Sequence, residues 1–547
     1  MIGGIDLPIE SVETPSRSPP DARWAWCLAL GSVLVLACAL RLWSIHDVPG
    51  NVFYDAAVRS MGSSWHNFFF GALEPGGTVS IDKPPVDLWL QVTATSMLGF
   101  GLVGLHLPEA VGGVVACGLL FGALRRPFGC GAALSAALAL AVLPVAVLTA
   151  RSDTMDSVLA VLEIAALWLS WRALESARMR WSVLAAAVMG VAFNVKLGEM
   201  LIALPALALL WLWAAAPGTR VRVVLATAGT FLAVALSWTA IASLTPTRER
   251  PFPIGSANGS IWHVTLVYNG LERLSSRGAT GMAEGGAGPL RLLSAGPMQY
   301  WTLVGVALLA SSLLGLLALA VRLARGRERL RRSIHSPPGK LAVGIAVWFL
   351  TGLVAFSAME RLQVRYLEAF APAICAVLGL SLSVLWRGGE SARARRRGDV
   401  AGSGRVVGLR ICLVCVGLGL LVTLLIKDAY VIRRARSDSL LSDFSTPALS
   451  RYLQAHDGGA RYEVASANVN DVVGLVARDD LPVLVLNSVD GSLTRTKTLQ
   501  AQVSQRRVRF YFAAPHACHG GRRCPGNQIW AYAHSTPVSG QPGLRRF

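Results

Sequence analysis

Apolar runs of about 20 residues, each long enough to cross a lipid bilayer, recur along most of this 547-residue chain. Hydrophobic residues make up 53% of the sequence and charged residues only 15%, whereas about a quarter of a typical soluble protein is charged. We therefore predict an α-helical polytopic membrane protein with about 11–13 transmembrane helices. Eleven candidate spans lie near 24–45, 108–124, 128–149, 154–174, 181–197, 200–217, 223–245, 300–321, 340–357, 367–388 and 408–427.

The net charge of +19 is concentrated in arginine clusters between apolar runs, such as 322–332 and 391–398. Short loops rich in Lys and Arg are retained in the cytoplasm, so these clusters indicate topology rather than nucleic-acid binding. With the tail 1–23 placed in the cytoplasm, every short arginine-rich loop falls on that side. This agreement requires segment 86–104, which carries Asp87 and Gln91, to lie along the membrane interface rather than cross it.

The opposite face then receives the loops 46–107 and 246–299, together with short connections between other spans. Ionisable groups from distant parts of the chain would share this surface, and such groups at a membrane are usually functional. They include Asp55, Glu74, Asp82, Lys83, Asp153, Asp156, Lys196, Arg361 and Arg365.

Residues 437–547 have the pattern of a separate extracytoplasmic α/β domain, after a transmembrane domain at 24–430. Strands are predicted at 462–470, 481–488 and 507–514, with helices at 437–455 and 496–505. Cys518 and Cys524 lie in this polar region and could form a disulfide in an oxidising compartment. The neighbouring His516 and His519 are either metal ligands or ordinary surface histidines.

Several blocks resemble the GT-C superfamily of membrane glycosyltransferases, which contains protein O-mannosyltransferases and aminoarabinose transferases. These are "YDAAVRSMGSSWHNFFFGALEPGGTVSIDKPPVDLWLQ", "ARSDTMDS", "FNVKLGEM", "YNGLERL" and "RYLEAFAPAICAVLG". They are similar to a bacterial, mannosyltransferase-like subgroup with an extracytoplasmic C-terminal domain. The resemblance implies transfer of a sugar from a polyprenyl-phosphate donor, on the outer face of the plasma membrane, to a lipid, glycan or protein acceptor.

A donor of this kind places an anionic phosphate at the membrane interface, where cations must bind it. Lys83, Lys196, Arg361 and Arg365 are the candidate phosphate-binding residues. The alternative is that they are ordinary interfacial side chains whose charged ends reach water. Lys83 precedes two prolines, which stiffen its backbone.

Glycosyl transfer to a hydroxyl needs a carboxylate that accepts the proton, or a metal that lowers the hydroxyl pKa. In related mannosyltransferases an Asp-Glu pair early in the first outer loop serves as the base, but the matching positions here are Gly50 and Asn51. Asp55 and Asp82 are therefore the alternative catalytic residues, with Glu74 as a competitor. A divalent metal remains an open requirement.

Sugar or acceptor binding is predicted for Trp65, His66, Glu74, Asp153 and Asp156. Each has a structural alternative: an interfacial aromatic belt for Trp65, a structural histidine, loop hydrogen bonding for Glu74, and helix capping for the two aspartates. We therefore predict that the protein is a glycosyltransferase that transfers the sugar with inversion. The rival interpretations are a lipid-sugar transporter, which would carry charges in mid-helix, and a membrane protein that binds envelope glycan.

Overall fold

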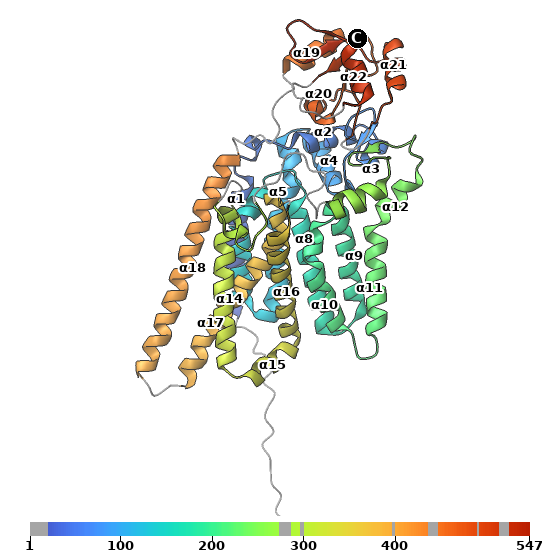
Figure 1. Ribbon diagram of the computed structural model, residues 1–547. Helices are drawn as coiled ribbons and strands as arrows, with labels where there is room; N and C mark the ends of the chain where they lie inside the picture. Colours follow the sequence, from blue (N-terminus) through green and yellow to red (C-terminus); the bar gives the residue numbers. More distant parts are fainter. Residues whose placement is uncertain are drawn as a thin grey trace, which may run out of the picture.

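The computed structural model describes residues 20–272, 286–295, 300–360, 362–395, 400–435, 447–488, 492–513 and 524–547. It consists of a bundle of roughly parallel long helices with a small α/β domain at one end (Figure 1). Within the described residues, seven helices are long and apolar enough to cross a membrane, or eight if one bent pair forms a single span. The seven spans lie within or around α1 (Pro20–Leu42), α5 (Leu102–Phe128), α8 (Asp156–Ser176), α14 (Val306–Ala324), α16 (Pro337–Ala358), α17 (Ala371–Arg395) and α18 (Val400–Ala435).

Helices occupy all eleven predicted spans, but four of these do not form a single long apolar helix. The segment 128–149 is divided into α6 (Cys130–Ala141) and α7 (Pro144–Thr149), because Pro144 favours a new helix start. The segment 223–245 is bent by 46° between α11 (Arg220–Ala235) and α12 (Ser237–Leu244). The remaining two are α9 (Met179–Lys196) and α10 (Leu204–Ala214).

Short elements form the first outer loop, at the end of the bundle that carries the α/β domain (Figure 1). They are α2 (Val52–Met61), α3 (Trp65–Phe70), β1 (Val79–Ser80) and α4 (Val86–Leu98). With 13 residues, α4 is about 20 Å long and too short to cross the ~30 Å hydrocarbon layer, in agreement with the predicted interfacial segment. β1 pairs in parallel with β2 (Phe252–Pro253), so the two predicted outer loops are joined.

The C-terminal domain contains a five-stranded sheet in the order β4-β3-β5-β7-β6. β3 (Val464–Ser466), β4 (Val483–Val485) and β5 (Phe510–Phe512) correspond to the three predicted strands, and they are parallel to one another. The predicted helices are found as α19 (Pro447–His456) and α21 (Thr496–Ser504). The sequence did not predict α20 (Val473–Asp479), α22 (Gly526–Ala533), β6 (Thr536–Pro537) or β7 (Leu544–Arg546).

The C-terminal domain contacts the membrane domain mainly through α20, which packs against α2. The Arg59 guanidinium of α2 donates a hydrogen bond of 3.4 Å to the main-chain carbonyl of Ala477 in α20. The domain therefore rests on the helix that carries Asp55.

Candidate active site

The first part of the candidate site is built around the Tyr54 hydroxyl on α2. Lys83 donates a hydrogen bond of 2.8 Å to this hydroxyl, and its ammonium nitrogen lies 5.1 Å from the centre of the Tyr54 ring. The same ammonium is 3.4 Å from a carboxylate oxygen of Asp82, its neighbour in the sequence. Only about an eighth of either side chain is exposed, 12% for Lys83 and 13% for Asp82, so this ion pair is shielded from water.

The second part lies where α8 begins and α9 ends. Lys196, the last residue of α9, forms an ion pair with Asp156, the first residue of α8. The other oxygen of Asp156 accepts a hydrogen bond of 2.7 Å from the Thr154 hydroxyl. The Lys196 ammonium also lies 5.6 Å from the ring centre of Tyr366. Both charged groups are buried, so the pair stabilises this end of the bundle only while both partners are present.

Arg365 lies near both parts. Its guanidinium is within electrostatic range of Tyr54 in the first part and of the Asp156 carboxylate in the second. It also lies 5.9 Å from the ring centre of Tyr366. Lys83, Lys196 and Arg365 therefore come from three distant segments and surround two tyrosines. The fourth predicted cation, Arg361, lies outside the described residues.

A buried pair of carboxyl groups, Asp55 and Asp153, adjoins these groups in the sequence: Asp55 follows Tyr54, and Asp153 precedes Thr154, whose carbonyl accepts a hydrogen bond of 3.3 Å from Lys196. The main-chain N–H of Asn51 donates a hydrogen bond of 3.0 Å to Asp153, which attaches the start of α2 to the connection before α8. Burial, with repulsion from Asp153 and a hydrogen bond to it, raises the pKa of Asp55 well above its ordinary value. Two adjacent buried carboxyl groups cannot both ionise without cost, which accounts for the part of this shift that Asp153 causes.

Gly50 leaves the space that the Asp55 carboxyl group occupies. A Cβ atom added at position 50 would overlap both carboxyl oxygens of Asp55. The family resemblance drawn from the sequence implies an acidic pair at positions 50 and 51. In this chain the carboxyl group that lies against position 50 is that of Asp55, which α2 carries.

Asp82 is held through its main chain as well as its carboxylate. The side-chain amide of Asn269 donates a hydrogen bond to the Asp82 carbonyl. Asn269 belongs to the π-helix η3 (His263–Leu271), which lies in the second predicted outer loop. Sequence reasoning assigned no role to Asn269, Tyr54 or Tyr366, although all three lie in the sequence blocks that carry the family resemblance.

The remaining predicted residues of the first outer loop contact parts of the loops themselves. Both carboxylate oxygens of Glu74 accept hydrogen bonds from its own turn, including one of 2.7 Å from the Gly76 N–H and one of 2.9 Å from the Thr78 hydroxyl. His66 Nε2 lies 2.9 Å from the Glu249 carbonyl, so this ring joins the two outer loops. The Trp65 side chain is 84% exposed on α3, away from the charged cluster.

Further buried carboxyl groups extend this network toward α4 and α5. Gln91 of α4 donates hydrogen bonds to the Asp87 carboxylate at 3.0 Å and to the Asp153 carbonyl at 3.2 Å. Burial raises the pKa of Asp87 to about 6. Glu109 of α5 accepts a hydrogen bond of 2.7 Å from the Ser157 N–H. Arg151 has a structural role, since it donates to main-chain carbonyls at the end of α1, including Trp43 at 2.7 Å.

The structure also bears on the predicted disulfide and on metal binding. Cys524 is disulfide-bonded, whereas its predicted partner Cys518 lies outside the described residues, as do His516 and His519. In the described ranges, no group of three or more His, Cys, Asp or Glu side chains is arranged to hold a metal ion.

Comparison with known proteins gives three kinds of likeness. The model of the Dolichyl-phosphate-mannose-protein mannosyltransferase family matches residues 82–243. YycA and YkcB of Bacillus subtilis (strain 168), whose mannosyltransferase names are themselves provisional, are 33% and 32% identical over 46% of this chain. The matched segments cover only 38% and 35% of these two relatives.

Solved structures resemble this chain over most of its length. ArnT from Cupriavidus metallidurans, bound to undecaprenyl phosphate, matches with a TM-score of 0.52 and 16% identity over 88% of this chain and 89% of ArnT. The Archaeoglobus fulgidus oligosaccharyltransferase matches with a TM-score of 0.56 and 14% identity over 90% of this chain and 70% of that protein. Identities this low indicate a shared fold. The family model, the Bacillus relatives and this shared fold all indicate similarity to the GT-C superfamily of membrane glycosyltransferases.

Proposed function

We propose that this protein transfers a sugar from a polyprenyl-phosphate donor to an acceptor hydroxyl on the extracytoplasmic face of a bacterial plasma membrane. The observation that carries the proposal is the gathering of Lys83, Lys196 and Arg365 around Tyr54 and Tyr366, with the buried carboxyl group of Asp55 next to Tyr54 in the sequence. Cations can hold a phosphate leaving group, and a carboxylate can accept a proton. The arrangement therefore supplies both halves of a glycosyl transfer.

In this mechanism Lys83 and Arg365 bind the donor phosphate. Arg365 offers a planar fork of donors, and Lys83, which Tyr54 positions through a hydrogen bond, offers a point charge. Asp82 orients Lys83, and Asp156 orients Lys196. The undecaprenyl phosphate bound to ArnT supports a ligand of this class, since the two chains share a fold.

Asp55 is the general base of the proposal. The acceptor hydroxyl attacks the anomeric carbon, the bond from that carbon to the phosphate oxygen breaks, and the hydroxyl proton passes to Asp55. Polyprenyl phosphate leaves with the electron pair, and the sugar is transferred with inversion. A base works best when its pKa lies near the operating pH, and the raised pKa of Asp55 is a shift in that direction. Asp153 orients the base and the start of α2.

The orientation of the site follows from the arginine-rich ends of the spans. α15 (Arg327–His335) carries part of the densest cluster and lies at the end of the bundle opposite the C-terminal domain (Figure 1). If arginine-rich loops are cytoplasmic, the candidate site and the C-terminal domain are extracytoplasmic. Because α20 packs on α2, the domain is well situated to select the acceptor.

Binding of undecaprenyl phosphate tests the donor half of the proposal. We expect Lys83→Ala and Arg365→Ala each to weaken binding to the purified protein by about tenfold, since a charge-assisted hydrogen bond is worth roughly 1.5–3 kcal/mol. Lys340→Ala is the matched control, because Lys340 is on α16 and donates to the Trp213 carbonyl away from the site. Equal affinities for all four proteins would remove Lys83 and Arg365 from the donor site.

A lipid-sugar transporter is the rival function, and one observation favours it. Glu163 lies two turns into α8 from Asp156 and is buried, and neither of its carboxyl oxygens has a hydrogen-bond partner. Buried ionisable groups within a span are typical of transport pathways. A transporter would move a radiolabelled lipid-linked sugar between leaflets without releasing lipid phosphate. A transferase would release the lipid phosphate.

A further inference from the structure

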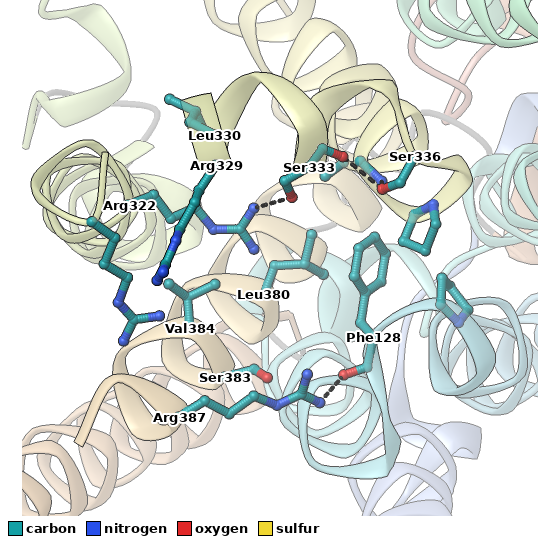
Figure 2. A pocket seen from close by; sticks show the side chains of 15 residues that line it. Phe128, Arg322, Arg329, Leu330, Ser333, Ser336, Leu380, Ser383, Val384 and Arg387 are labelled. Atoms are coloured by element: carbon teal, nitrogen blue, oxygen red, sulfur yellow. Dashed lines mark hydrogen bonds between the residues drawn. The ribbon is translucent and has the colours of Figure 1, made fainter. Parts of the chain in front are cut away.

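A cavity lies among the helix ends on the face opposite the C-terminal domain, far from the candidate active site. Its volume is about 450 Å³, and its walls come from the end of α5, the end of α14, α15, the start of α16, and α17. Figure 2 shows Arg322 and Arg329 on one side of this space and Arg387 on another. Ser333 and Ser336 lie where α15 ends and α16 begins. This cavity belongs to the arginine-rich region that the proposed transfer reaction does not use.

Positive charge is concentrated in the walls of the cavity. Four arginines contribute, namely Arg322, Arg325, Arg329 and Arg387. Arg322 is repelled electrostatically by Arg325 and Arg387. Among the residues that the structure describes, no carboxylate forms an ion pair with Arg322, Arg325 or Arg329. Gathering Arg322, Arg325 and Arg329 without a carboxylate partner among the described residues is unfavourable, so these three arginines indicate an anionic ligand.

Two of these arginines are held in place by neighbouring helices. A guanidinium nitrogen of Arg387 donates a hydrogen bond of 2.6 Å to the Phe128 carbonyl at the end of α5. Arg322 contacts the Ser333 hydroxyl of α15 at 3.5 Å (Figure 2). Gly339 allows α15 and α16 to meet closely, because a Cβ atom there would overlap the Ser333 carbonyl. The charged groups are therefore positioned by the packing of four helices rather than by one exposed loop.

The other walls of the cavity are apolar. They include Leu380 and Val384 of α17, Phe128 of α5, and Leu330 of α15. A free phosphate ion gains nothing from such walls, whereas a lipid presents a phosphate group attached to hydrocarbon. The cavity also lies at the ends of membrane-length helices, and the ends of such helices meet the headgroup layer of a bilayer. Basic pockets between transmembrane helices on the cytoplasmic side suit anionic lipid headgroups.

We propose that this cavity binds the phosphate headgroup of an anionic phospholipid from the leaflet opposite the candidate active site. The arginines contact the phosphate oxygens, and Leu380, Val384 and Phe128 contact the glycerol and the upper acyl chains. The lipid would join α14, α15 and α17 at their charged ends. This proposal does not depend on the reaction at the other face.

Native mass spectrometry of the full-length protein in detergent, titrated with phosphatidylglycerol, tests the proposal. We expect Arg322→Ala/Arg329→Ala to weaken binding of the first phosphatidylglycerol about tenfold. The control Arg220→Ala/Arg222→Ala removes two exposed arginines from the first turn of α11 and should change binding less than about twofold. The variant Arg322→Lys/Arg329→Lys keeps the charge and should retain most of the affinity, which separates loss of charge from misfolding.

Two further titrations identify the ligand chemistry. Phosphatidylcholine, which has no net charge, should bind the wild-type cavity about tenfold more weakly than phosphatidylglycerol. Millimolar inorganic phosphate should change the affinity for phosphatidylglycerol by less than about twofold, because the apolar walls contribute binding energy only to the lipid. Equal binding of the two lipids, or full displacement by inorganic phosphate, would overturn the assignment to an anionic lipid. Equal loss in the cavity variant and in the α11 control would overturn the assignment to this cavity.

Discussion

At the scale of single residues, the proposed active site depends on the placement of Asp55 against Gly50 and beside Asp153. Gly50 leaves open the space that the Asp55 carboxyl group fills, and Asn51 donates its N–H to Asp153. Neither contact has a recognisable sequence motif. The sequence could name Asp55 as one of two alternatives, but only the folded chain brings it beside Asp153.

A double-mutant cycle tests the fit between Gly50 and Asp55. Gly50→Ala alone should destabilise the protein by about 1–3 kcal/mol, because its methyl group meets a buried carboxyl group. In the Asp55→Ala background the same change should cost little, giving a coupling on the order of 1 kcal/mol. Thermal unfolding of the four proteins measures this coupling. Additive effects would mean that the carboxyl group does not occupy the space at position 50.

The raised pKa of Asp55 predicts a pH-dependent cost to stability. Between the ordinary pKa of about 3.9 and the raised value, folded Asp55 keeps a proton that the unfolded chain has lost. Stability therefore falls as pH rises through this window, and Asp55→Asn should remove the cost. We expect the variant to unfold roughly 2 °C or more above wild type at pH 7.5, with a smaller difference at pH 4.5.

Asp47→Asn is the control for this measurement, because Asp47 is exposed and lies outside the buried pair. Its effect should be small at both pH values. A difference between wild type and Asp55→Asn that does not change with pH would contradict the assignment of the titrating group.

At the scale of elements, the length of each apolar run predicted where helices occur but not where a helix is interrupted or bent. The interruption at Val142 and Leu143, between α6 and α7, has only Pro144 as a sequence signal, and the bend between α11 and α12 has no proline at all. Strands β6 and β7 escaped prediction because "TP" and "LRR" are short and lack alternating apolar residues. β7 pairs with β5 and β6 pairs with β7, and the local sequence does not encode these pairings.

At this scale we predict that the stability of the protein depends on the close approach of α6 and α17. A Cβ atom at Gly379 would lie 2.5 Å from the Ala132 carbonyl and 2.8 Å from the Ala136 nitrogen, which are main-chain atoms that cannot rotate away. Small residues allow transmembrane helices to approach closely. Gly379→Val should therefore destabilise the protein by about 1–3 kcal/mol or prevent its folding, as a thermal unfolding assay in detergent would detect.

Gly417→Val on α18 is the matched control, since no heavy atom lies within 4 Å of a Cβ there. It should unfold within about 1 °C of wild type. If both variants lose stability equally, the loss reflects valine in a helix rather than the contact between α6 and α17.

At the scale of the whole molecule, the fold gathers groups that the sequence separates widely. Sequence analysis predicted that Asp82, Lys83, Asp153 and Lys196 would share one face; hydrogen bonds link Lys83 to Tyr54, Gln91 to the Asp153 carbonyl, and Lys196 to the Thr154 carbonyl. It could not assign Tyr54 or Tyr366, because a tyrosine in an apolar segment is most often a packing residue. It also missed the buried Asp87 and Glu109, whose place in the site depends on how α4 and α5 pack together.

The most direct measurement is release of lipid phosphate from radiolabelled undecaprenyl phosphate sugar by purified protein in the presence of envelope extract as acceptor. We predict turnover by wild type and by Lys340→Ala, and a loss of at least about a hundredfold in Asp55→Asn, which should still bind undecaprenyl phosphate. If Asp55→Asn, or its double variant with Asp82→Asn, turns over as fast as wild type, the proposed active site is contradicted.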